Sequence, residues 1–177
     1  VGAIGVLIEV VLLRRIYQAP ELFQLLATFG VVLMVQDVAL ASWGPQDLLG
    51  PRAPGFRSFV TIFGSRFPTY ELFLIMLGPI VLGALWLLFN RTRWGTLVRA
   101  ATLDREMVGA LGVNQRLLFT SVFFLGSCLA GLGGALQLPR EAVNLHMDLS
   151  IIAEAFVVVV VGGLGSVTGA YLAAVII

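Results

Sequence analysis

Long apolar segments separated by short polar ones dominate this chain. A helix needs roughly 20 apolar residues to cross a bilayer core about 30 Å thick. Three segments meet that length: residues 21–41, 71–90 and 115–138. Residues 1–13 are interpreted as the end of a further span, and residues 151–177 as a span that glycines interrupt at 162–166. The pattern predicts an all-α fold, a polytopic transmembrane helical bundle with one Gly-interrupted span, in a single domain of residues 1–177.

The composition argues against a soluble domain. The chain is 59% hydrophobic and only 12% charged, whereas soluble domains carry about 25% charged residues. Its formal net charge of +1 gives no indication of binding to nucleic acid. The chain begins and ends inside apolar runs, so we expect a fragment of a longer protein rather than a protein with a signal peptide.

The distribution of arginine indicates how the spans are oriented. Seven arginines lie on one side of the predicted spans: Arg14, Arg15, Arg91, Arg93, Arg99, Arg105 and Arg116. Four lie on the other side: Arg52, Arg57, Arg66 and Arg140. Because cytoplasmic loops carry an excess of Lys and Arg, we expect the first side to face the cytoplasm.

A polar segment over residues 95–112 separates two of the predicted spans. Apolar residues recur in it at helical spacing: Ala100, Leu103, Met107, Ala110 and Leu111. Arg99, Asp104 and Arg105 fall elsewhere on the helical wheel, and Gly112 stands where a glycine would end the helix. We therefore predict a short amphipathic helix over residues 102–111 on the cytoplasmic side, with an apolar stripe suited to docking on a partner protein.

The loop on the opposite side, residues 42–69, is rich in proline and glycine, which favours turns. Phe56, Phe59, Val60 and Phe63 nevertheless have the i, i+3, i+4, i+7 spacing of a helix. We predict a short helix lying in the membrane interface, in preference to a docking surface for an external partner.

The glycines at 162–166 permit two interpretations. A helix broken at membrane depth exposes N–H groups that can hold an anionic group such as a carboxylate. Alternatively, small residues four apart allow close helix packing, and Gly162, Ser166 and Ala170 form such a row. From spacing alone, packing is favoured over ligand contact. Gly163 is expected to lie where two segments of backbone approach each other closely.

Ionisable residues inside predicted spans are functional candidates by default. Asp37 and Glu154 lie near the ends of their spans, where each can reach the interface. Glu9 precedes Arg14 and Arg15 and could pair with them.

Residue types required for catalysis or metal binding are scarce. His146 is the only histidine and Cys128 the only cysteine, so neither a His-based triad nor a Cys/His metal site can be assembled. All 11 basic residues are arginine, whereas a nucleotide-binding P-loop needs a lysine. We expect no enzyme activity, no metal and no cofactor. Any linked ATP hydrolysis must then occur on another polypeptide.

An ordered set of motifs resembles the permease subunits of branched-chain amino acid ABC transporters. The motifs are Arg99-Ala100-Ala101, Asp104-Arg105-Glu106-Met107, Ala110-Leu111-Gly112-Val113-Asn114, Leu129 through Gly134, Ala155-Phe156, Gly162 through Ser166, and Leu26 through Gly30 with Gln36. The likeness runs over most of the 177 residues and is closer to the LivH-type subunit than to the LivM-type subunit. Asp37 departs from the family pattern, which has an amide such as Asn there.

The resemblance implies a multi-pass subunit of an importer in a bacterial inner membrane. Two permease subunits would form the pathway, and a cytoplasmic ABC ATPase dimer would bind their coupling helices. A periplasmic or lipid-anchored binding protein would deliver the amino acid. The residues that would contact the ATPase are Leu103, Met107 and Leu111, with a polar rim of Arg99, Arg105 and Glu106 and with Gly112 at the end of the helix. Those that would line the translocation path are Gly162, Gly163, Gly165, Ser166 and Asp37.

Two other functions are compatible with the residues. An ion-coupled secondary transporter would share the broken helix but should carry paired acidic residues near the bilayer midplane, whereas Asp37 and Glu154 lie near span ends. A non-transporting membrane scaffold would use the glycine rows for packing and the amphipathic helix for a different partner. A neighbouring ATPase gene would count against both.

Overall fold

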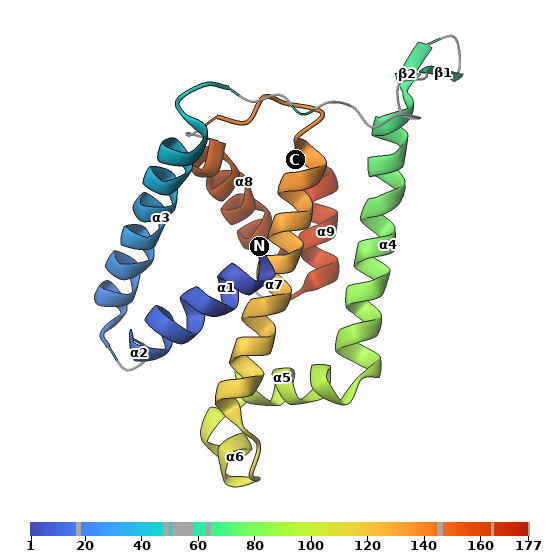
Figure 1. The fold of residues 1–177 in the computed structure, drawn as a ribbon. Coiled ribbons are helices and arrows are strands. Elements are labelled where there is room, and N and C mark those ends of the chain that lie inside the picture. The colour runs from blue at the N-terminus through green and yellow to red at the C-terminus, as the bar shows by residue number, and fades with distance from the viewer. Residues whose placement is uncertain are drawn as a thin grey trace. The chain divides into compact units, whose positions relative to one another are not determined.

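The computed structural model describes residues 1–16, 19–47, 50, 59–62, 65–144, 147–163 and 165–176. Helices dominate this part of the chain, as predicted (Figure 1). They are α1 Gly2–Ile8, α2 Arg14–Ile16, α3 Glu21–Trp43, α4 Thr69–Arg91, α5 Arg93–Leu103, α6 Arg105–Ala110, α7 Gln115–Gln137, α8 Met147–Gly162 and α9 Val167–Ile176. A π-helical segment, η1 Glu9–Leu13, joins α1 to α2, and the strands β1 Phe59–Ile62 and β2 Ser65–Pro68 precede α4.

Several helices are suited to crossing a membrane. Among the described residues, three helices are long and apolar enough, and the bent pair of α8 and α9 makes a fourth if it is one broken span. The three are α3, α4 and α7, which cover the segments that the hydrophobic pattern predicts. Pro20 precedes α3 and Gly44 follows it, while α4 continues through Pro79. The prediction of a polytopic membrane protein built from helices is confirmed.

The contacts within the chain divide it into two compact units, which are described separately. Unit 1 comprises Val1–Leu48, Leu97–Leu138 and Ala142–Leu145, and unit 2 comprises Leu49–Thr96, Pro139–Glu141 and His146–Ile177. A single domain over residues 1–177 stays a prediction.

In unit 1, α1 packs against α7 through two glycines. A Cβ atom added to Gly2 would collide with the sulfur of Cys128, and one added to Gly5 would lie 2.5 Å from the Cβ of Ser127. Neither position can therefore carry a side chain unless α1 moves away from α7. Glu9, the first residue of η1, follows directly after α1 and is fully buried. Its Oε2 lies 3.5 Å from Nη2 of Arg14, which confirms the expected pairing with that arginine.

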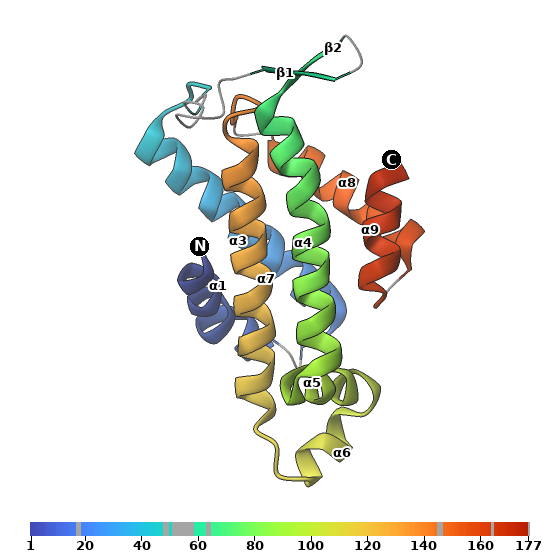
Figure 2. The same cartoon turned by 90° about the vertical axis from the view of Figure 1, so that its right-hand side faces the viewer.

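In unit 2, α9 packs against α4. A Cβ atom added to Gly78 would lie 3.4 Å from Cε2 of Tyr171, so the absence of a side chain on α4 makes room for the tyrosine ring. The bend between α8 and α9 is visible in Figure 2 and measures 118°. The predicted interruption of the last span is confirmed.

The loop before α4 contains a hairpin, so the predicted interfacial helix is wrong. Phe59 and Val60 belong to β1, which pairs antiparallel with β2. Phe56 and Phe63 lie outside the described residues. Gly64 and Pro68 disfavour a helix, and an extended segment satisfies its backbone groups by pairing with its neighbour.

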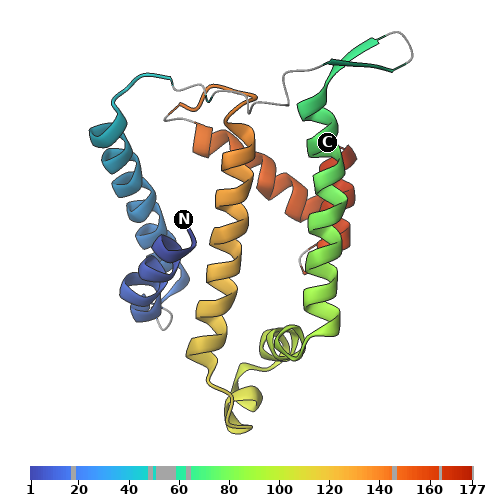
Figure 3. The same ribbon diagram turned by 45° about the vertical axis from the view of Figure 1, so that its right-hand side comes forward.

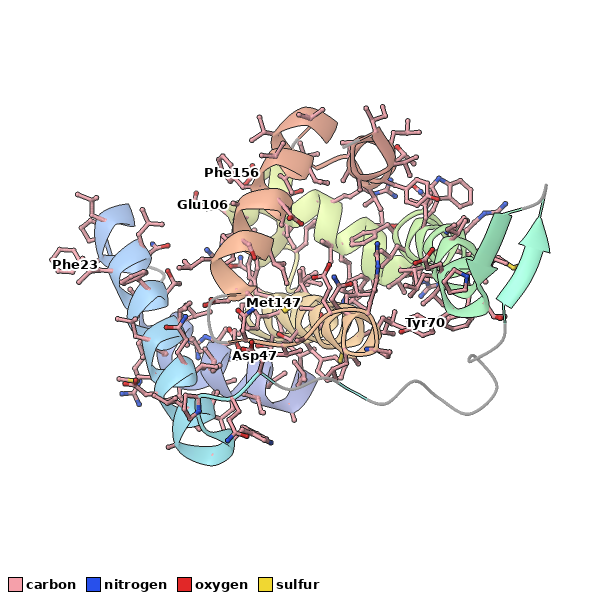
Figure 4. The ribbon with its side chains drawn as sticks, turned by 90° about the horizontal axis from the view of Figure 1, so that it is seen from above. Phe23, Asp47, Tyr70, Glu106, Met147 and Phe156 are labelled. Atoms are coloured by element: carbon pink, nitrogen blue, oxygen red, sulfur yellow. The ribbon has the colours of Figure 1, made fainter. Side chains whose placement is uncertain are left out.

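Few apolar side chains are buried within either unit. Phe23 on α3 and Phe156 on α8 are 66% and 70% exposed, and Figure 4 shows both projecting outward from their helices. Among the residues whose burial is described, the buried apolar ones are Tyr70, Ala101, Val108, Leu118 and Ala173. Such extensive apolar exposure on long helices suits contact with lipid or with other membrane helices rather than with water.

Candidate functional site

The segment expected to be one amphipathic helix over 102–111 is two helices, and this part of the prediction is wrong. Asp104 lies between α5 and α6 in an extended conformation, with φ −146° and ψ 101°. Its Oδ1 accepts a hydrogen bond from the N–H of Met107 at 2.9 Å. An aspartate that caps a helix start in this way satisfies a backbone donor that has no partner within the helix. Asp104 therefore ends α5 and starts α6.

The apolar residues assigned to partner contact are exposed on α5, on α6 and directly after α6. Leu103, Met107 and Leu111 are 88%, 60% and 76% exposed. Val108, the neighbour of Met107, is only 4% exposed. One side of α6 is therefore fixed within unit 1, while Met107 and Leu111, four residues apart, present an apolar surface outward.

The polar residues assigned to the rim of this surface are also exposed. Arg99 lies on α5, and Glu106 lies in the first turn of α6. A negative charge there interacts favourably with the positive end of the helix dipole. Gly112 follows α6 with φ +81°, a conformation that side chains other than glycine rarely adopt. Its N–H donates to the carbonyl oxygen of Gly109 at 3.0 Å.

A polar linkage that the sequence pattern does not reveal joins α6 to the start of α7. The side-chain amide of Gln115 donates to the carbonyl oxygen of Arg105 at 2.7 Å, and Nε of Arg105 donates back to Oε1 of Gln115 at 3.3 Å. The guanidinium carbon of Arg105 lies 4.4 Å from the ring centroid of Phe119. Figure 3 shows α6 next to the end of α7, and the two helices are in contact. The sequence offers a single hint of this linkage, the glycine at position 109 inside a helical segment.

The glycines at the break between α8 and α9 serve two different structural purposes. A Cβ on Gly162 would lie 2.5 Å from the backbone N of Ala170, and one on Gly169 would collide with the carbonyl oxygen of Gly162. The close backbone approach is therefore at Gly162 and Gly169. The expectation that it lies at Gly163 is wrong, since nothing is within 4 Å of a Cβ added there.

Gly163 and Gly165 are instead required by their backbone conformation. Their φ values are +88° and +89°, a region that is costly for residues with a Cβ. The Oγ of Ser166 accepts a hydrogen bond from the N–H of Gly169 at 3.0 Å and so caps the first turn of α9. These residues form the break itself, and their role in a translocation path stays a prediction.

The acidic residues singled out from the sequence lie on different elements. Asp37 is exposed on α3 of unit 1, and Glu154 is exposed on α8 of unit 2. Glu9 is the buried one, and its Oε2 also lies 2.7 Å from Oγ1 of Thr120 on α7. His146 is outside the described residues. Within the part of the chain that is described, no group of three His, Cys, Asp or Glu side chains is arranged to hold a metal ion.

Comparison with known proteins identifies the family of the chain. Residues 1–177 match the family described as "Branched-chain amino acid transport system / permease component". The high-affinity branched-chain amino acid transport system permease protein BraD of Pseudomonas aeruginosa is 26% identical over 177 residues, which cover 97% of this chain and 57% of BraD. The LivH permease proteins of Salmonella typhimurium and Escherichia coli K12 are each 25% identical over 180 residues, with 99% of this chain and 58% of LivH covered.

The chain thus spans somewhat more than half the length of these curated relatives. No solved structure matches it. The family match extends over the whole chain, the relatives' names also describe permease proteins of branched-chain amino acid transport systems, and the long apolar helices are suited to crossing a membrane. The chain belongs to the permease component family of branched-chain amino acid transport systems.

Proposed function

We propose that this protein is a permease subunit of an ABC importer in a bacterial inner membrane, and that it moves branched-chain or related amino acids. In this proposal a cytoplasmic ATPase dimer docks on α5 and α6, and a second permease subunit completes the pathway. A periplasmic or lipid-anchored binding protein delivers the solute.

The observation that carries the proposal is the exposed apolar surface of Leu103, Met107 and Leu111. These side chains lie on or directly after α5 and α6, which stand between the long helices α4 and α7 in the sequence. The arginine distribution assigns this segment to the cytoplasmic side. An apolar face on a short helix is the kind of surface that inserts into a groove of a partner protein.

The substrate class is supported by the relatives. BraD and LivH are described as permease proteins of high-affinity branched-chain amino acid transport systems. The break between α8 and α9 is a suitable place for a polar solute to meet backbone groups, because helices are interrupted at membrane depth only where protein or a wet cavity surrounds the freed backbone. ATP binding and hydrolysis on the partner would supply the energy for the change between outward- and inward-facing forms.

Co-purification of the full-length protein tests the proposal. The wild type is expected to retain an ATPase, and Met107→Asp combined with Leu111→Asp is expected to lose it, because two charges would be buried without partners in the contact. The matched control is Met107→Leu combined with Leu111→Met, which keeps an apolar surface of similar volume and should retain the ATPase.

The outcome also separates this proposal from the alternatives. A wild-type protein that purifies without an ATPase, yet moves solute into liposomes under an ion gradient, would establish a secondary transporter. If it carries no solute under either energy source, the scaffold function is favoured.

A further inference from the structure

The linkage between Arg105 and Gln115 connects the proposed docking helix to a membrane span. Gln115 is the first residue of α7, and its amide forms hydrogen bonds with both the backbone carbonyl and the side chain of Arg105, the first residue of α6. Phe119, one turn further along α7, lies beneath the Arg105 guanidinium. Two residues of the span thus hold one residue of the docking helix.

The glycine at position 109 is part of the same arrangement. A Cβ atom added there would collide with Nε2 of Gln115, the atom that donates to Arg105. Gly109 has no positive φ that would require glycine, and glycine within a helix is less favourable than alanine. Glycine at position 109 therefore leaves room for the Gln115 amide, which crosses α6 to reach the carbonyl oxygen of Arg105.

A helix as short as α6 cannot transmit movement by its own rigidity. It has six residues, and isolated helices shorter than about 12 residues are marginal in water. The chain that leads from α6 to α7 passes through four residues outside any helix, 111–114, and Gly112 among them has φ +81°. Movement of α6 can reach α7 through this connection or through the side-chain linkage, which ties the two helices by two hydrogen bonds and by the contact of Arg105 with the Phe119 ring.

We propose that Gln115 is the positioning residue that converts movement of the docking helix α6 into movement of the span α7. This inference rests on the proposed function, because it requires an ATPase that acts on α6. It predicts that the linkage is dispensable for holding the ATPase and necessary for coupling ATP hydrolysis to transport.

The test compares variants of the full-length permease, assembled with its ATPase in proteoliposomes. Gly109→Ala is the sharpest variant, since alanine improves the helix propensity of α6 while its Cβ displaces the Gln115 amide. Gln115→Ala removes the linkage directly. The matched control is Gly126→Ala in α7, where a Cβ would meet nothing within 4 Å.

Both linkage variants are expected to retain the ATPase and to lower the solute moved per ATP hydrolysed by about thirtyfold, the change in an equilibrium constant produced by losing two hydrogen bonds of ordinary net strength. The control should match the wild type. The double variant Gly109→Ala with Gln115→Ala should be no worse than Gln115→Ala alone, because both changes break the same linkage.

An unchanged ratio of transport to hydrolysis in Gly109→Ala and Gln115→Ala, with ATPase bound, would overturn the inference and leave the proposed function intact. Absence of the ATPase from the wild-type protein would instead overturn the proposed function. If Gln115→Ala fails to assemble, Gly109→Ala decides the matter, since its substitution favours the helical state of α6.

Discussion

Glu9 and Arg14 are joined twice, once through the backbone and once through their side chains. The N–H of Arg14 donates to the carbonyl oxygen of Glu9, and Nη2 of Arg14 lies 3.5 Å from Oε2 of Glu9. In an α-helix, side chains five residues apart point about 140° away from each other. In a π-helix, residues i and i+5 are bonded across one turn, so their side chains lie on nearly the same face. The π-helical segment η1 therefore brings Arg14 to the face of Glu9.

The same turn directs Arg14 toward α7. Its Nη2 donates to Oγ1 of Thr120 at 2.9 Å, and this hydroxyl lies 2.7 Å from Oε2 of Glu9. A π-helical turn of this kind is frequently found at functional positions. Here it assembles three polar side chains from two helices into one cluster.

We predict that Arg14→Ala destabilises the protein by about 2 kcal/mol. Removing one partner of a fully buried ion pair costs about 3–5 kcal/mol, and the effect is smaller here because the Arg14 side chain is 33% exposed. Thermal or denaturant unfolding of the purified protein in detergent measures the change. Arg15→Ala is the control, because Arg15 is an exposed neighbour of the same type and should lie within about 0.5 kcal/mol of the wild type. Equal effects of the two variants would contradict the prediction.

Gly5→Val should weaken the packing of α1 on α7. The new Cβ would overlap Ser127, and overpacking of this kind typically costs about 1–3 kcal/mol. Unfolding in detergent would show the loss, and Gly30→Val on α3 provides the comparison because a Cβ there meets nothing within 4 Å. A Gly5→Val protein as stable as the Gly30→Val protein would show that α1 does not rely on this contact.

Asp104→Ala should weaken association with the ATPase by about fivefold. The substitution leaves the Met107 N–H without its cap, which costs about 1 kcal/mol of helix stability. Asp104→Asn keeps an oxygen acceptor and should bind almost as the wild type does, since asparagine is an equally good capping residue. Titration of the purified ATPase against the permease measures both variants. Equal losses in alanine and asparagine variants would indicate that the charge, not the cap, matters.

The two kinds of glycine at the α8–α9 break should respond differently to substitution. Gly163→Ala is expected to cost about 1–2 kcal/mol because of its positive φ, and Gly163→Asn should cost less because asparagine enters this region more readily. At Gly162 we expect the opposite order: asparagine should cost more than alanine, because the larger side chain meets the backbone of Ala170. Unfolding measurements on the four variants test this reversal. The same order at both positions would refute it.

Much of the fold is accessible from the sequence because hydrophobic length is a strong signal. The expected span at 21–41 corresponds to α3 at Glu21–Trp43, and that at 71–90 to α4 at Thr69–Arg91. Glycines that interrupt an apolar run likewise predict the break before α9, where two of them adopt positive φ. These elements depend on local composition alone.

The features that the sequence does not reveal depend on contacts between distant residues or on competing local signals. The residues on either side of Asp104 have helical spacing. The Asp104 side chain nevertheless caps a new helix, α6, and so divides the segment into two helices. Thr120 lies 111 residues from Glu9 in sequence, and no periodicity pairs them. In the hairpin, the spacing of Phe59 and Val60 fits a helix, but strand pairing prevails.

The bend between α8 and α9 also bears on how this protein is made. At 1.5 Å per residue, α8 with 16 residues is about 24 Å long and α9 with 10 residues about 15 Å, so neither half alone crosses a core of about 30 Å. The ribosome completes α4 before it begins α9, so Gly78, which makes room for the Tyr171 ring, is synthesised before the tyrosine. The order of synthesis therefore supplies the long helix before the short helix that packs against it.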